Sequence, residues 1–262
     1  PIEMYPEQVI TLMREGRIEE LAEQVRYPLK RTFPLSRLWQ PADFVERYDE
    51  IFDEAYRQQI IASEAGQWDH LGWRGRTYAG LWVDEDEDII RAINHESPAE
   101  EARRLALIES IRAILHPSLQ DFAEPLEYME TAKFKIWIDK TADGSYRYAS
   151  WSRRFSLSGE PDLVLTGGSL ELSGSMGGKI YTFTNGDVQY RVFASGSAKS
   201  GRPYITVEQG GEQLLRQEGQ WVDLATVVAD PSPGPGTFSP TGRETLQSYV
   251  PMESTTYWVG AE

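Results

Sequence analysis

The spacing of hydrophobic residues divides the chain into a helical first part and a β-rich second part. In the first part, apolar residues recur at steps of three and four, the period of an amphipathic helix. Gly16 separates two short helical patterns, and Pro41 suits the first position of a longer one. A capping-box sequence, Ser97-Pro-Ala-Glu100, marks the start of the last helical pattern. We therefore predict helices over residues 6–15, 18–25, 41–60 and 98–115.

A stretch rich in tryptophan and glycine, residues 68–83, alternates apolar and polar positions and predicts a β-strand. An acidic turn at 84–88 and an apolar run at 89–95 complete a long β-hairpin, on which we expect the helices to pack. One face of its first strand collects two arginines and two large aromatic residues: Arg74, Arg76, Tyr78 and Trp82. Arginines stacked on aromatic rings bind carboxylates, sugars or peptides, so these four are our candidate ligand-binding residues. The alternative is a solvated strand face held by cation–π packing.

Beyond residue 131 the period changes from that of a helix to that of a strand. Four glycine-containing turns each lie between two apolar runs, and such turns join antiparallel strands: Asp143-Gly144, Thr166-Gly-Gly168, Asn185-Gly186 and Gly210-Gly211. Four hairpins in series predict an antiparallel sandwich or barrel.

These patterns predict three regions. An α+β domain covers residues 1–120, an antiparallel β domain covers 131–222, and a tail rich in proline and glycine covers 223–262 and docks as an edge strand. Whether the strands near 134–151 belong to the first or the second domain is left open.

Composition narrows the functional classes. The formal net charge of -15 repels phosphate backbones, so we expect no nucleic-acid partner. The sequence has no run of about 20 apolar residues, the length that spans a bilayer. The chain begins at Pro1, either because a leader was removed or because the chain was trimmed there; we favour removal of a leader, which predicts a periplasmic or cell-surface protein.

No catalytic or metal-binding pattern stands out. The three histidines, His70, His95 and His116, lack metal-ligand spacing, and there is no cysteine. Adjacent carboxylates such as Glu100 and Glu101 are interpreted as solvated helix faces. We therefore predict no catalytic residue, no metal and no cofactor, and whether the protein is an enzyme stays open.

Three segments resemble a known family: Val25-Arg-Tyr-Pro-Leu-Lys30, Asp43–Phe52, and the glycine- and tryptophan-bearing hairpin that ends in Ile90-Arg-Ala-Ile-Asn94. They are similar to uncharacterised secreted proteins of Gram-negative bacteria with the nuclear transport factor 2-like (SnoaL-like) fold. The resemblance covers at most residues 6–116, and its motifs are structural. It implies a cone of helices and curved sheet around a pocket that serves either an enzyme or a binder, and it assigns no catalytic residue.

Together these arguments predict an α+β protein with a cone-like helix-plus-curved-sheet N-terminal domain followed by an antiparallel all-β domain. The predicted function is that of an exported binding or interaction protein, such as an inhibitor, whose partner is a small molecule or an envelope protein. The alternative is a weak enzyme of hydrolase or isomerase type that uses a pocket in the N-terminal cone.

Overall fold

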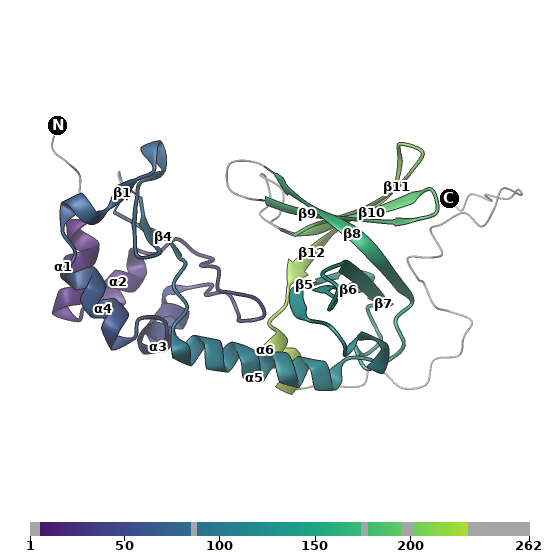
Figure 1. Cartoon of the computed structure of the whole chain (residues 1–262), viewed down its shortest axis with the longest axis horizontal. Coiled ribbons are helices and arrows are strands. Elements are labelled where there is room, and N and C mark those ends of the chain that lie inside the picture. The colour runs from purple at the N-terminus through teal and green to yellow at the C-terminus, as the bar shows by residue number, and fades with distance from the viewer. Residues whose placement is uncertain (1–5, 85–87, 174–177, 195–201, 230–262) are drawn as a thin grey trace, which may run out of the picture. The chain divides into compact units, whose positions relative to one another are not determined.

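The computed structural model describes residues 6–84, 88–173, 178–194 and 202–229 (Figure 1). The chain forms two compact units, and the division between Glu109 and Ser110 falls within helix α5 (Pro98–Ile114). Each unit has its own hydrophobic core. Of the predicted tail, the structure describes helix α6 (Leu224–Ala229), and the predicted edge strand lies outside the described residues.

The first two predicted helices are confirmed as α1 (Glu7–Glu15) and α2 (Ile18–Glu23). Gly16 ends α1 in the left-handed conformation, with φ of 67°, which glycine adopts without steric cost. Its N–H donates to the carbonyls of Leu12 and Met13 at the end of that helix. The helix predicted after the Ser97 capping box is also present, as α5.

The single helix predicted over 41–60 is wrong, because two helices, α3 (Pro41–Ile51) and α4 (Glu54–Ile61), occupy this stretch. Phe52 leaves helical geometry with φ of -104° and ψ of 79°. Asp53 then starts α4, since its Oδ1 accepts a hydrogen bond from the Tyr56 backbone N–H at 2.9 Å. The apolar spacing continues across this break, so periodicity alone did not reveal it.

We expect Asp53→Ala to lower the free energy of unfolding by about 1 kcal/mol, the usual effect of losing an N-cap side chain. The hydrogen bond from Tyr56 N–H, followed by the interaction with His95, lowers the pKa of Asp53. The cap therefore stabilises the fold above the ordinary aspartate pKa and loses this effect as the pH falls below about 4. Urea titrations at neutral and acidic pH test this, with the neighbouring exposed Asp49→Ala as control. Equal losses for both variants at neutral pH would contradict the capping role.

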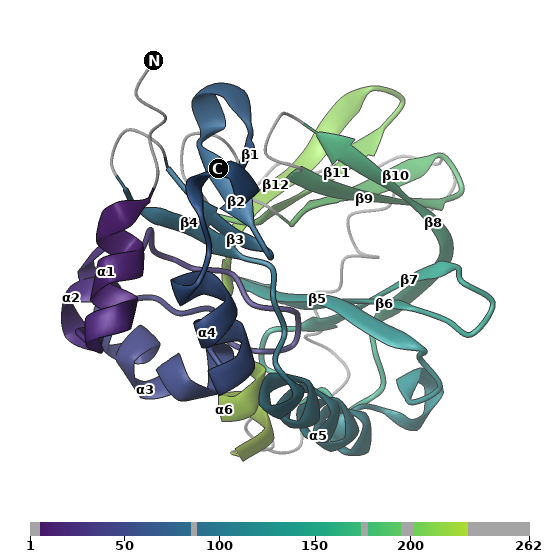
Figure 2. The same ribbon diagram turned by 60° about the vertical axis from the view of Figure 1, so that its left-hand side comes forward.

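The sheet of the first unit has four short antiparallel strands in the order β1-β2-β3-β4 (Figure 2). Their bounds are β1 Asp69–His70, β2 Arg76–Tyr78, β3 Leu81–Val83 and β4 Ile90–Ile93. The predicted long hairpin is thus wrong. A 3-10 turn at Gly72–Arg74 and a two-residue turn at Ala79-Gly80, with φ of 48° and 86°, divide its first strand into three.

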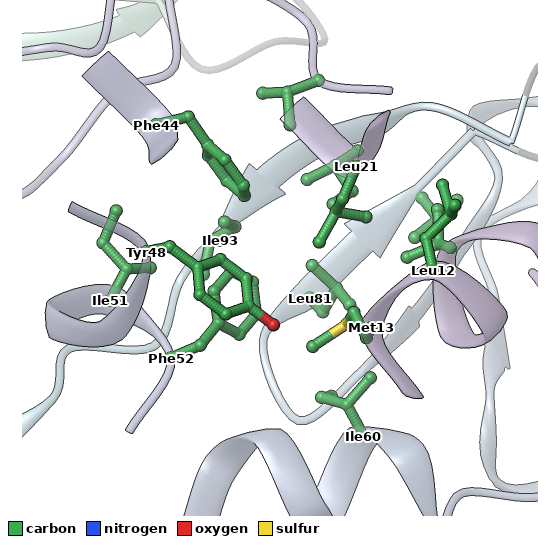
Figure 3. Close-up of a cluster of buried hydrophobic side chains, with 14 of the residues drawn as sticks. Leu12, Met13, Leu21, Phe44, Tyr48, Ile51, Phe52, Ile60, Leu81 and Ile93 are labelled. Atoms are coloured by element: carbon green, nitrogen blue, oxygen red, sulfur yellow. The ribbon is translucent and has the colours of Figure 1, made fainter. Parts of the chain in front are cut away.

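The core of this unit lies between its helices and its sheet (Figure 3). Aromatic side chains of α3, α4 and the link between them contact one another in a row, in which the rings of Phe52 and Tyr56 are stacked and the other pairs are tilted: Phe44, Tyr48, Phe52 and Tyr56. The predicted cone is a wrong fold, because the sheet has only four strands and large buried side chains occupy the space over it. The strands near 134–151, which were candidates to complete the sheet, pair within the second unit instead.

The second unit is a closed, eight-stranded antiparallel barrel. Each strand from β5 to β12 pairs with the next, and β12 closes the barrel by pairing with β5. The strands are β5 Glu124–Thr131, β6 Phe134–Lys140, β7 Tyr146–Ser152, β8 Leu163–Ser173, β9 Gly178–Asn185, β10 Val188–Phe193, β11 Tyr204–Gln209 and β12 Glu212–Trp221. Of the two predicted architectures, sandwich or barrel, the barrel is present. The unit is not all-β, because it also contains the end of α5, a 3-10 turn at Pro117–Leu119 and α6.

Three predicted hairpins are confirmed, and the one at Thr166-Gly-Gly168 is wrong. Residues Leu163–Ser173 form one long strand, β8, whose first half pairs with β7 and whose second half pairs with β9. Gly167, with φ of 72°, lies at a register shift that bends the strand from one pairing to the other. A Cβ atom on Gly168 would lie 2.3 Å from the Phe183 ring, so this glycine serves close packing and not a turn.

Both faces of β6 and β7 are buried. The inward side chains, including Ile136, Ile138 and Tyr148, belong to the barrel core. The outward Asp139 and Arg147 are also buried, because residues 117–122 cover them: Arg147 donates to the carbonyl oxygens of Ser118 and Leu119. This arrangement places a buried ion pair on the outer wall of the barrel.

Candidate functional site

The structure does not place the four predicted ligand-binding residues on one face. Arg74 lies in the 3-10 turn, Arg76 and Tyr78 lie in β2, and Trp82 lies in β3. Thr77 pairs with Trp82 and Tyr78 pairs with Leu81. Trp82 therefore shares a face with Thr77, opposite Arg76 and Tyr78. The two-residue turn at Ala79-Gly80 inverts the alternation that the sequence pattern assumed.

Two of these four residues have clear structural roles. The Trp82 indole N–H donates to the Arg74 carbonyl oxygen at 2.5 Å, which fastens the turn to β3. The Tyr78 ring lies 5.6 Å from the Trp68 ring, between centroids, and packs against the core. Ligand binding by Arg74, Arg76, Tyr78 and Trp82 stays a prediction.

The second unit has a cavity of about 560 Å³ on the outer wall of the barrel. Its lining comes from the end of α5, from β5 and β6, from the loop after β7, from Val222 just after β12, and from α6. We call this cavity the barrel groove and define it by four apolar and two charged side chains: Ile114, Leu157, Val222, Val227, Glu130 and Lys135. Its volume is within the range of about 300–1,000 Å³ that is usual for small-molecule sites.

Strand alternation and register place the two charged residues of the groove. Met129 and Ile136 are paired and point into the barrel core, so their neighbours Glu130 and Lys135, also paired, point outward. The loop after β7 lies beside them: the Lys135 ammonium donates to the Phe155 carbonyl oxygen at 2.8 Å. The Leu157 carbonyl oxygen accepts a hydrogen bond at 2.9 Å from the backbone N–H of His116, just after α5.

The groove is lined by one cation and one anion, Lys135 and Glu130, which are cross-strand partners. Glu130 Oε2 lies 2.9 Å from Arg153 Nε, and its Oε1 accepts a hydrogen bond from the Tyr128 hydroxyl at 2.6 Å. The Glu130 carboxylate is therefore neutralised by Arg153. Lys135, in contrast, makes its one side-chain hydrogen bond to a neutral carbonyl.

Burial lowers the pKa of Lys135, and the nearby Glu130 charge opposes this shift only in part. Desolvation disfavours the charged form of an ammonium group, and a nearby anion favours it. An anion bound at Lys135 would thus interact with a half-buried cation that has no paired carboxylate of its own among the described contacts.

The sequence pattern does not reveal this site. Lys135 lies in an alternating run, Phe134-Lys-Ile-Trp-Ile138, where a charged residue is expected to face solvent. The groove forms only where α5, the loop at 153–158 and α6 meet the outer wall of the barrel, and these segments are far apart in the sequence. The spacing of residues within any one segment therefore does not indicate that these segments come together.

Within the part of the chain that the structure describes, no group of three or more histidine, cysteine, aspartate or glutamate side chains is arranged to hold a metal ion. Of the described helices, none has the length and apolar character needed to cross a membrane.

Comparison with protein-family models, curated proteins and solved structures finds no match to this chain. The resemblance to nuclear transport factor 2-like proteins therefore rests on the sequence pattern alone, and function has to be argued from the geometry of the chain itself.

Proposed function

We propose that this protein binds an amphiphilic anion, a molecule with an apolar body and one carboxylate or similar acidic group, in the barrel groove. The observation that carries the proposal is Lys135, a half-buried ammonium group that lies in a cavity beside aliphatic side chains and donates to a neutral carbonyl. The role is binding and not catalysis.

The apolar part of the ligand would contact the aliphatic side chains of the groove. Ile114, Leu157, Val222 and Val227 come from three different segments and present hydrophobic surface to the same cavity. Burial of apolar area contributes about 25 cal/mol per Å², so a chain of several methylene groups supplies most of the affinity.

The acidic group of the ligand would lie at Lys135. Lys135 is the cation that lines the groove, and the carboxylate of its neighbour Glu130 is paired with Arg153, within a chain of net charge -15. A carboxylate there would form a hydrogen bond in which both partners are charged, whereas the Phe155 carbonyl oxygen that Lys135 now contacts is neutral.

Export to the periplasm or cell surface is part of the same proposal, and the resemblance to secreted proteins of Gram-negative bacteria supports it. An envelope lipid fragment or fatty acid has the amphiphilic chemistry that the groove would select. The predicted ligand-binding surface that includes Arg74 and Trp82 is a separate candidate binding site. If the variants Arg74→Ala and Trp82→Ala bind envelope partners as the unchanged protein does, this surface is not a binding site.

We expect Lys135→Gln to weaken the binding of decanoate by about tenfold or more, which corresponds to about 1.4 kcal/mol. Isothermal titration calorimetry at neutral pH measures this. Lys140→Gln is the matched control, because Lys140 lies on the same strand and the substitution changes the same charge, but Lys140 does not line the groove. Decanol, which has the same chain but no charge, should bind both variants and the unchanged protein alike.

The pH dependence gives a second readout of the same interaction. Because the pKa of Lys135 is lowered, the affinity for decanoate should fall with rising pH at a lower pH than an ordinary lysine would require. The proposal is wrong if Lys135→Gln and Lys140→Gln reduce decanoate affinity equally, or if neither does.

A further inference from the structure

Among the lysines on the described strands of the barrel, Lys135 is the one whose ammonium group does not lie against a carboxylate. Lys140, on the same strand, and Lys179, on β9, each lie within 4 Å of a glutamate oxygen, at 3.9 Å and 3.6 Å. The half-buried Lys135 donates instead to the neutral carbonyl oxygen of Phe155 at 2.8 Å. Lys135 also lines the barrel groove, whereas the other two lysines do not.

The carboxylate that shares the groove with Lys135 makes its close contacts elsewhere. Glu130 is the cross-strand partner of Lys135 and lines the same cavity. Its Oε2 lies 2.9 Å from Arg153 Nε, and its Oε1 accepts a hydrogen bond from the Tyr128 hydroxyl at 2.6 Å. An adjacent anion favours the charged form of an amine, so Glu130 supports the charged form of Lys135 only from a greater distance.

The surroundings of Lys135 favour its neutral form. Burial lowers the pKa of Lys135, Glu130 opposes this shift in part, and Arg153 adds to it. The other residues that line the groove, from α5, the loop after β7, Val222 and α6, are uncharged. At a given pH, a larger fraction of Lys135 is therefore the neutral amine than for an ordinary lysine, and the neutral amine is the form that attacks a carbonyl carbon.

We propose that the barrel groove is also a site of reversible covalent binding, in which the Lys135 amine forms an imine with an aliphatic aldehyde. The alkyl chain of the aldehyde would contact the aliphatic side chains of the groove, such as Ile114, Leu157 and Val227. This inference rests on the proposed function in one respect, the entry of an apolar chain into the groove. It differs in the form of Lys135 that acts, because imine formation uses the neutral amine and carboxylate binding uses the charged one.

The reaction needs no reagent besides the aldehyde. The Nζ lone pair forms a bond to the carbonyl carbon as the π bond to oxygen breaks, and one amine proton moves to that oxygen to give a carbinolamine. The carbon–oxygen bond then breaks, and the hydroxyl group leaves as water with the second amine proton, which yields the imine. Ser156 and Ser158 line the same cavity, and a hydroxyl from either can donate a hydrogen bond to the carbinolamine oxygen.

Reductive trapping tests this inference on the unchanged protein. Sodium cyanoborohydride converts the imines formed with decanal to stable secondary amines, and mass spectrometry of the digested protein locates the labelled lysines. At neutral pH we expect about tenfold more label on Lys135 than on Lys140, the matched control that lies on the same strand but outside the groove. Equal labelling of the two lysines would overturn the proposal.

A short aldehyde separates the effect of the groove from the reactivity of the amine. Propanal has the same reacting group as decanal but far fewer methylene groups to bury, so the preference for Lys135 over Lys140 should be larger with decanal. An equal preference with both aldehydes would show that the groove does not take up the chain, which contradicts the proposal.

Lys135→Arg separates this inference from the proposed function. Arginine keeps the positive charge but lacks the amine, so the variant should bind decanoate and lose the decanal label in the groove. Decanoate binding that depends on Lys135, without selective decanal labelling of Lys135, would overturn this inference and leave the proposed function standing. Selective labelling without decanoate binding would do the reverse.

Discussion

Asp139→Ala is expected to lower the free energy of unfolding of the barrel by about 3–5 kcal/mol, the usual effect of removing one partner of a buried ion pair. Asp139 is fully buried on the outer wall and accepts hydrogen bonds from Arg147 Nε and Nη2, both at 3.0 Å. The Trp137 indole N–H donates to the same carboxylate at 2.6 Å. Without Asp139, the 95% buried Arg147 guanidinium and the Trp137 N–H both lose their main partner.

The effect on Arg147 explains the size of this loss. Burial alone would lower the pKa of Arg147, but the hydrogen bonds and charges of Asp139 and Asp121 raise it overall, so the guanidinium stays charged. A charged group that remains buried after its partner is removed is more costly than the pair itself. Arg147 also holds the segment over β6 and β7 through the carbonyls of Ser118 and Leu119, so we expect that segment to loosen.

Asp121→Ala is the matched control for this experiment. Asp121 contacts the same guanidinium, with its Oδ1 2.7 Å from Arg147 Nη1, but its side chain is 76% exposed. An exposed ion pair contributes at most about 1 kcal/mol. Urea titrations of both variants, with amide hydrogen exchange of β6 and β7, measure the two losses. Similar losses for Asp121→Ala and Asp139→Ala would show that burial of the pair is not what stabilises this wall.

Glu100→Gln is expected to lower the free energy of unfolding of the first unit by about 3 kcal/mol or more, again because a buried charge loses its partner. Glu100 is fully buried near the start of α5 and pairs with two arginines. Its Oε1 lies 2.8 Å from Arg31 Nε and 2.9 Å from Arg47 Nη2, and its Oε2 pairs with Arg31 Nη2. The amide of glutamine keeps the shape of the side chain but removes the anion that both guanidinium groups share.

The ion pair between Arg31 and Glu100 also stabilises the link between the sheet and α5. Arg31 also donates to the carbonyls of Ile93 and His95, at 2.5 Å and 2.6 Å, so one guanidinium joins the end of β4 to α5. Glu101→Gln is the control, because Glu101 is the exposed neighbour, and surface substitutions usually change stability by less than about 0.5 kcal/mol. Thermal and urea unfolding followed by circular dichroism would compare them. A loss no larger for Glu100→Gln than for Glu101→Gln would contradict this assignment.

At Glu100, the sequence predicted the local helix cap correctly but not the buried ion pair. The capping box predicted that Ser97 starts α5, and the Glu100 N–H does donate to the Ser97 hydroxyl oxygen at 3.1 Å. The sequence interpretation of Glu100 as part of a solvated face is wrong, because its carboxylate turns to Arg31 and Arg47, which come from far earlier in the chain. The cap is a local property, and the ion pair is a property of the tertiary fold.

The barrel shows the same limit. Asn185-Gly186 and Gly210-Gly211 predicted hairpins correctly, because the turn itself requires the residues that form it. Gly167-Gly168 misled the prediction, because a bulge and the close approach of Phe183 require glycine as much as a turn does. The prediction that Arg76, Tyr78 and Trp82 share one face of the sheet is wrong for a related reason. The turn at Ala79-Gly80 places Trp82 on the opposite face. The barrel groove left no local signal.

The pairing that closes the barrel has a consequence for how this chain folds. β5 and β12 are joined over only three residue pairs, Thr131 with Gly219, Glu130 with Gln220 and Met129 with Trp221, whereas the other strand pairs of the barrel are neighbours in sequence. Each neighbouring pair can form early through a short loop, but the closing pair must wait until both ends of the meander meet, at a larger loop-closure entropy. Gly219 faces the Glu130 carbonyl oxygen so closely that a Cβ atom would lie 2.9 Å from it. The barrel is therefore closed by three residue pairs, and at one of them a side chain larger than that of glycine would collide with the backbone of the facing strand.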